Sequence, residues 1–157
     1  MTEAVADLAR AQHGLVSHEQ LSTVLGPGQL RAWRRNGRLE PMRRGVYRVS
    51  GAPPSWEQSV LAVCLAVPGA TASFRCAAAL WELEGFAAGA VEITVPGRQR
   101  TRLAGVTVHD STVSGPIHRA VLRGIPTTSA LAHSATSPRW SRSGSSSERS
   151  TRPFAAG

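Results

Sequence analysis

The chain has 157 residues, 41% of them hydrophobic, which is enough for one ordinary domain or two very small ones around an apolar core. It carries 18 basic residues against 10 acidic ones, a net charge of +8, and every basic residue is an arginine. The absence of lysine excludes a P-loop and a nuclease centre with a Glu-x-Lys step. No apolar run has the length of a membrane span and no secretory signal precedes the first helix, so we expect a soluble, cytoplasmic protein.

The first 25 residues predict two helices. Apolar residues share one face of the first helix, which ends at His13-Gly14. A second helix should begin at Ser17, because Ser17 and Gln20 form a Ser-x-x-Gln capping box.

Residues 28–49 concentrate the positive charge, with seven arginines and Glu40 as the single acid. We predict a third helix from about Gly28 to Asn36, with Gly37 as its left-handed cap. Its apolar positions, Leu30 and Trp33, should point toward the first two helices. Arginines at a spacing of three and four residues form a cationic stripe on the opposite face, with a fourth just past the helix end: Arg31, Arg34, Arg35 and Arg38.

A basic hairpin should follow this helix. Residues 38–43 and 45–49 predict two short strands joined at Arg44-Gly45, and the hairpin carries Arg43, Arg44 and Arg48. Three short helices followed by such a hairpin are the elements of a winged helix-turn-helix. We therefore predict that the third helix lies in a DNA major groove while the hairpin flanks it on phosphates or in the minor groove.

The alternative interpretation of the stripe is a solvated helix face. Like charges three and four residues apart cost a few tenths of a kcal/mol each, and a solvated helix normally mixes signs to avoid this cost. No acid lies on this face. A polyanion would offset the repulsion through counterion release, which favours the nucleic-acid interpretation.

The remainder, residues 53–129, predicts a small α+β unit. Residues 55–69 should form a mostly apolar, buried helix capped by Ser55, and residues 73–86 another helix, ended by Gly85. Residues 91–96 and 105–111 read as two alternating strands of a hairpin. Its loop would carry Arg98, Arg100 and Arg102, which we expect to be exposed without a role; contact with DNA, RNA or a protein partner is the alternative.

Other residue types point to packing rather than chemistry. Cys64 and Cys76 lie in apolar surroundings, so we expect buried reduced thiols. The histidines and cysteines show no metal-ligand spacing, and we predict no metal and no cofactor. Trp33 and Trp81 should be core anchors, whereas Tyr47 would either donate a hydrogen bond to a phosphate or simply pack.

Six segments, taken in order, carry a resemblance to a known family: "HGLVSHEQL", "LRAWRRNGRLEPMRRGVYRV", "SWEQSVLAVCLA", "AAALWELEGF", "VEITVP" and "GIPTTS". Over residues 3–129 the chain resembles the AbiEi-like antitoxins of type IV toxin-antitoxin systems. The resemblance implies a DNA-binding winged helix at residues 1–52 that represses its own operon. It also implies that residues 53–129 counter a nucleotidyltransferase toxin without a stable complex.

Transferred residue by residue, the family's DNA contact falls on the third helix and the hairpin, at Gln29, Arg31, Arg34, Arg35, Arg38, Arg43, Arg44 and Tyr47. The alternative function is a protein-interaction module that restrains the toxin without binding DNA. Many relatives continue into a nuclease-like domain that would lie beyond this chain, so we predict that the chain is not an enzyme. Residues 130–157 depart from the family pattern and are Ser/Arg-rich; we expect a disordered tail, for which a shifted reading frame is one hypothesis.

Overall fold

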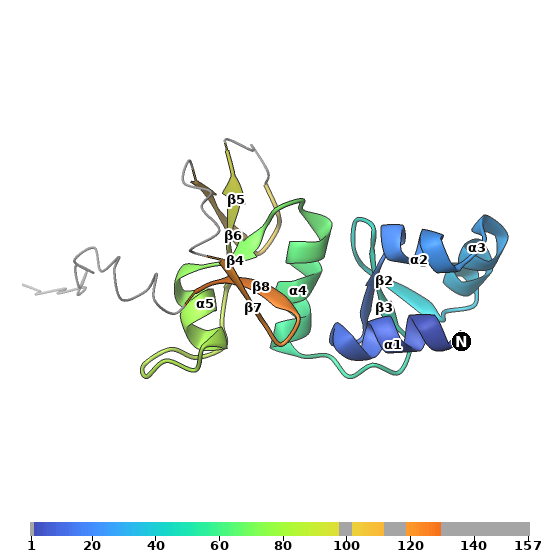
Figure 1. Cartoon of the computed structure of the whole chain (residues 1–157), viewed down its shortest axis with the longest axis horizontal. Coiled ribbons are helices and arrows are strands. Elements are labelled where there is room, and N and C mark those ends of the chain that lie inside the picture. Colours follow the sequence, from blue (N-terminus) through green and yellow to red (C-terminus); the bar gives the residue numbers. More distant parts are fainter. Residues whose placement is uncertain (1, 98–101, 112–118, 130–157) are drawn as a thin grey trace, which may run out of the picture.

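The computed structural model describes residues 2–97, 102–111 and 119–129, and the protein is α+β, as the sequence predicted (Figure 1). The helices in these ranges are α1 (Glu3–Ala11), α2 (His18–Val24), α3 (Pro27–Arg35), α4 (Trp56–Ala66) and α5 (Phe74–Leu80). The strands are β1 (Leu15–Ser17), β2 (Leu39–Arg43), β3 (Val46–Val49), β4 (Thr71–Ala72), β5 (Val91–Pro96), β6 (Val106–Ser111), β7 (Arg119–Leu122) and β8 (Ile125–Thr128). The tail expected to be disordered, 130–157, lies outside the described residues.

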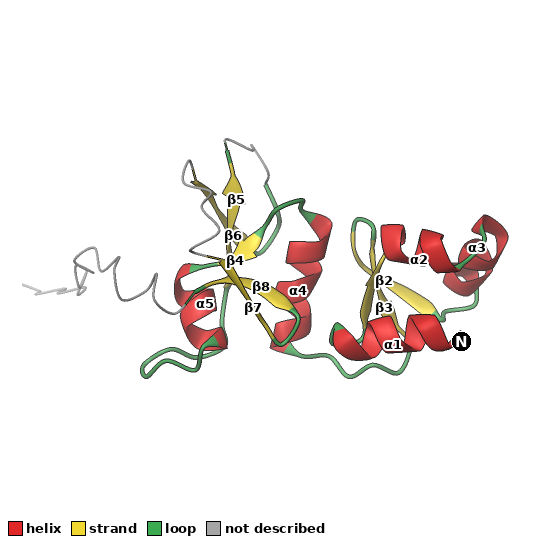
Figure 2. Ribbon diagram, viewed as in Figure 1, coloured by secondary structure: helices red, strands yellow, loops and turns green. Residues whose placement is uncertain are grey.

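The first 50 residues build a three-stranded antiparallel sheet with helices against one face. The strand order is β1-β3-β2, and Tyr47 of β3 pairs with Val16 on one side and Pro41 on the other. Side chains from α1, α2 and α3 share an apolar cluster with the sheet residues that face them. Figure 2 shows these three helices and the sheet together at one end of the molecule.

Local signals set the helix boundaries in this part, as predicted. The Ser17 hydroxyl accepts a hydrogen bond from the Gln20 backbone N–H at 3.1 Å, and the Gln20 side chain accepts from the Ser17 backbone N–H at 2.9 Å, which completes the capping box. Helix α3 ends at Arg35, and Gly37 follows with a φ of 74°, the left-handed conformation that glycine adopts without strain.

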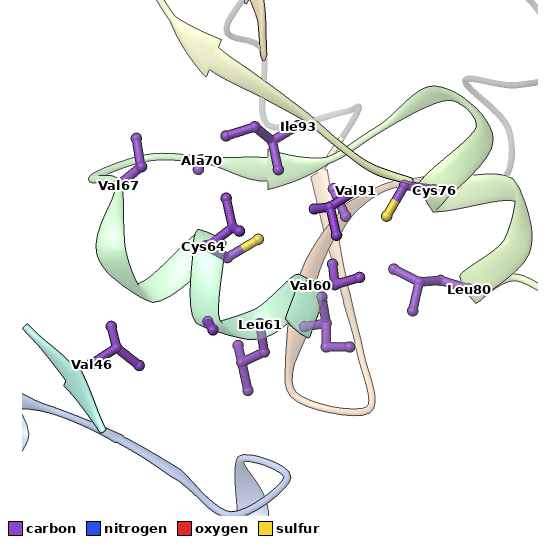
Figure 3. Close-up of a cluster of buried hydrophobic side chains, with 14 of the residues drawn as sticks. Val46, Val60, Leu61, Cys64, Val67, Ala70, Cys76, Leu80, Val91 and Ile93 are labelled. Atoms are coloured by element: carbon purple, nitrogen blue, oxygen red, sulfur yellow. The ribbon is translucent and has the colours of Figure 1, made fainter. Parts of the chain in front are cut away.

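Helix α4 is buried on all sides because it lies between the two sheets. Its side chains join a cluster that contains Leu15 and Val46 from the three-stranded sheet and Ile93 from the five-stranded sheet. Figure 3 shows Val46 on one side of α4 and Ile93 on the other. This position explains why the helix is apolar around its whole circumference.

The second sheet has the order β6-β5-β4-β8-β7. Strands β5 and β6 run parallel in the register Val91↔Val106 to Pro96↔Ser111, so the predicted hairpin at 91–111 is wrong. The alternation of side chains showed which face of each strand is buried, but it carries no information on the direction of a neighbour. At about 3.3 Å per residue, the connection 97–105 is long enough to return along a six-residue strand.

Three further differences concern elements defined by tertiary partners. Strands β1, β4, β7 and β8, of two to four residues each, were not predicted. Helix α5 ends at Leu80 rather than near Gly85, because Glu82 takes a left-handed φ of 55°. Trp81 is half-buried and donates a hydrogen bond from its indole N–H to the Thr128 carbonyl at 2.8 Å. Of the two tryptophans predicted to anchor the core, only Trp33 is buried.

Contacts also cross the predicted boundary between residues 52 and 53. The amide of the fully buried Gln58 donates to the His13 carbonyl at 2.7 Å, and the His13 ring lies 2.8 Å from the Arg123 carbonyl. With the apolar cluster around α4, these contacts join the two predicted units. The division into domains stays a prediction.

Candidate nucleic-acid interface

The candidate interface is built on α3. Leu30 and Trp33 anchor this nine-residue helix in the core at 6% and 5% exposure. Because successive residues turn by about 100°, Arg34 lies only about 40° around the axis from Leu30, and Arg31 and Arg35 lie further out. In the arginine stripe (Arg31, Arg34 and Arg35), Arg31 and Arg35 therefore lie on the side of α3 opposite the core, as the sequence predicted, whereas Arg34 lies beside the core face.

All three arginines of the stripe are exposed and uncompensated. None of them, nor Arg38, forms an ion pair with an acid within the described residues. The one hydrogen bond that holds a stripe side chain to the described backbone runs from Arg31 Nε to the Pro27 carbonyl, at 3.3 Å. The positive charge of the stripe is thus directed to the solvent.

The stripe borders a shallow groove between α3 and β2. Arg31, Arg34 and Arg35 form one wall, while Leu39 and Pro41 of β2 supply apolar surface beside them. Neither Leu39 nor Pro41 was a predicted site residue. Because they lie two residues apart in one strand, Leu39 and Pro41 share a face of the sheet, but the groove exists only once β2 packs beside α3.

Two predicted DNA-binding residues lie away from this groove or are covered. Gln29 is exposed, but it precedes Arg31 by two residues and so lies about 200° around the helix axis from it. Tyr47 is only 7% exposed and belongs to the core cluster, which answers the question left open for it in favour of packing.

The hairpin arginines are not gathered beside the stripe either. Arg48 pairs with Glu40 across β2 and β3, so its charge is neutralised. Arg43 is half-buried and donates to the Ala104 carbonyl, just before β6, at 3.3 Å. Arg44, in the turn between the strands, is exposed and lines a different hollow with residues of α2 and α4. Figure 1 shows this turn in the space between those helices.

The other predicted candidates show no reactive arrangement where the structure describes them. Cys64 and Cys76 are unpaired and buried, as expected, and burial raises the pKa of the Cys64 thiol from 9.0 to about 12. No three His, Cys, Asp or Glu side chains in the described ranges gather closely enough to bind a metal ion. Arg102 is exposed, whereas Arg98 and Arg100 lie outside the described residues.

Comparison with known proteins adds no family to this picture. No protein-family model matches the chain, and a search of curated proteins found no match. Within the described residues, no helix combines the length and apolar character needed to cross a membrane.

Proposed function

We propose that the chain is a cytoplasmic DNA-binding protein that represses its own operon and serves as the antitoxin of a type IV toxin-antitoxin system. In this proposal residues 1–52 are a winged helix-turn-helix, with α3 as the recognition helix and the β2–β3 hairpin as the wing. The proposal includes no catalytic step and no cofactor. Its partners are double-stranded operator DNA and a nucleotidyltransferase toxin.

The uncompensated arginine stripe carries this proposal. Arg31, Arg34 and Arg35 remain exposed on one side of a helix that Leu30 and Trp33 hold firmly in the core. Repulsion between the three guanidinium groups lowers the stability of the helix in the free protein, and phosphates would remove that cost. The order α1-β1-α2-α3-β2-β3 supports the winged-helix assignment, since a recognition helix preceded by a shorter helix and followed by a hairpin is its defining arrangement.

The dimensions of α3 are compatible with the assignment. An α-helix with its side chains is about 10–12 Å across, so a major groove about 12 Å wide admits it, and the nine residues of α3 extend over about 13.5 Å. Arg44 would reach a flanking phosphate from the side of α2. The antitoxin part of the proposal rests on the family resemblance of residues 3–129.

Fluorescence anisotropy tests the DNA part directly. The purified chain is titrated against its own upstream DNA and against a scrambled duplex of the same composition, each at two salt concentrations. We expect tighter binding to the upstream duplex and a steep loss of affinity with salt. Equal binding to both duplexes would reduce the stripe to a non-specific basic surface, and absence of binding would refute the proposal.

One observation favours a second function, a module that restrains the toxin while the amino-terminal unit acts only as a scaffold. The arginines of the wing either bind other groups of the protein or lie away from the stripe. Arg43 donates to the Ala104 carbonyl, Arg48 pairs with Glu40, and Arg44 lies by α2 and α4. The variant Arg31→Ala/Arg34→Ala/Arg35→Ala separates the two functions. Loss of repression with intact toxin neutralisation supports DNA binding, and the reverse supports the scaffold.

A further inference from the structure

Two arginines at the candidate interface lie over aromatic rings. The Arg34 guanidinium carbon is 5.4 Å from the centre of the Tyr47 ring, and that of Arg38 is 5.8 Å from the centre of the Trp33 ring. Both rings belong to the buried core. Arg31 and Arg35 make no such ring contact with the described residues, so the stripe contains one arginine with a ring beneath it and two without.

Tyr47 is a fixed support for Arg34. Its backbone pairs with strands on both sides, since β3 is the central strand, and the His18 ring lies 6.4 Å from the Tyr47 ring. A guanidinium over a ring face is attracted by the ring quadrupole and loses much of its rotamer freedom. Its N–H groups remain free at the edge of the plane, where they can donate two parallel hydrogen bonds.

The position of Arg34 points to the DNA backbone rather than to the bases. It is the stripe arginine nearest to the core side of α3 and to the hairpin, whereas Arg31 and Arg35 project further outward. Side chains at the flank of a recognition helix meet the phosphates that border the groove.

We propose that Tyr47 is a positioning residue whose ring holds the Arg34 guanidinium ready for a bidentate contact with a backbone phosphate of DNA. This inference rests on the proposed DNA-binding function. Ordering a free arginine on binding costs affinity, and a side chain already ordered in the free protein avoids most of that cost. The ring of Tyr47, and not its hydroxyl group, carries the role.

The first test compares Tyr47→Phe with Tyr47→Leu in anisotropy titrations with the upstream and scrambled duplexes, after thermal melts show that both variants fold. Tyr47→Phe keeps the ring and should bind like the unchanged protein. Tyr47→Leu should lose affinity about two- to five-fold, equally for both duplexes, because a phosphate contact carries no sequence information. If Tyr47→Phe loses as much as Tyr47→Leu, the hydroxyl group makes the contact and the proposal is overturned.

A double-mutant cycle then excludes a purely structural effect. If Tyr47 acts through Arg34, Tyr47→Leu should cost no further affinity in an Arg34→Ala background. An equal loss in both backgrounds would overturn the positioning role while leaving DNA binding intact. A wild-type chain that binds neither duplex would instead refute the proposed function, and the positioning role with it.

Arg34→Lys tests the same contact if Tyr47→Leu does not fold. Lysine keeps the charge but lacks the planar group that stacks on the ring and binds a phosphate through two N–H groups. We expect about a two- to five-fold loss for Arg34→Lys on both duplexes. Unchanged affinity would show that charge alone matters and would overturn the proposal.

Discussion

The salt dependence of DNA binding gives the sharpest test of the arginine stripe. Arg31, Arg34 and Arg35 are exposed and have no ion-pair partner among the described residues, so each is available to a phosphate. Each phosphate neutralised contributes about 0.9 to the slope of log K against log salt. If each of the three contacts one phosphate, replacing all three by alanine should lower that slope by about 2.7. Between 50 and 200 mM salt, the factor by which the wild type loses affinity should then be about 40 times the factor for the variant.

The matched control removes the same charge elsewhere. Arg10, Arg102 and Arg119 are exposed and lie on α1, before β6 and on β7, away from α3; of these, Arg10 forms an ion pair with Asp7. Anisotropy titrations at four salt concentrations give the slope for the wild type, the stripe variant and Arg10→Ala/Arg102→Ala/Arg119→Ala. Equal slopes for the two variants would show that only net charge matters, and the reasoning from the stripe would be refuted.

Three further predictions concern the framework that holds α3. Ser17→Ala removes one half of the capping box of α2 and should lower the free energy of unfolding by about 1 kcal/mol, measured by urea denaturation. Burial raises the pKa of Cys64 from 9.0 to about 12, so between these values its thiol stays protonated in the folded state but ionises in the unfolded chain. Folding stability should therefore fall as pH rises from 9 toward 12, and it should fall less in Cys64→Ala. Gly124→Ala should destabilise the protein by about 1–3 kcal/mol, since the added Cβ would lie 2.7 Å from the Ala11 carbonyl oxygen.

Each of these has its own control. Ser22 lies inside α2 and is exposed, so Ser22→Ala should change stability much less than Ser17→Ala; equal losses would mean that the cap is not what stabilises the helix. Gly51 shares a positive φ with Gly124 but has no neighbour within 4 Å of its added Cβ. If Gly51→Ala costs as much as Gly124→Ala, backbone strain rather than the contact with α1 explains the loss. A Cys64 thiol that reacts with iodoacetamide at pH 8 as fast as in urea would contradict its burial.

Features with a local physical cause could be predicted from the sequence. The capping box at Ser17 depends on side chains three residues apart, and the hairpin turn at Gly45 depends on a φ of 72° that glycine adopts freely. The burial of α4 followed from a run with Glu57 as its single charge. The first two features depend on residues close together in the chain, and the third on the composition of one short run.

Features that depend on distant partners could not be predicted. Strand β4 has two residues and exists because β5 and β8 pair with it. Arg43 belongs to a basic hairpin in the sequence, yet it donates to the carbonyl of Ala104, 61 residues away. The stripe itself was visible as a spacing of charges, but the ring beneath Arg34 and the groove beside β2 appear only after the hairpin has packed against the helix.

Helix α4 packs between the sheet that supports the candidate interface and the five-stranded sheet of the second half of the chain. Leu15 and Val46 belong to the three-stranded sheet, but they pack with α4 and with Ile93 of β5 in one cluster. A closely packed interior transmits displacement between its members, whereas a flexible linker would not. A change on the five-stranded sheet would therefore reach the hairpin that supports Arg34 through α4 and through the contact of Arg43 with Ala104. Under the proposed function, substitutions within this cluster, unlike those in the exposed stripe, should therefore affect toxin neutralisation and DNA binding together.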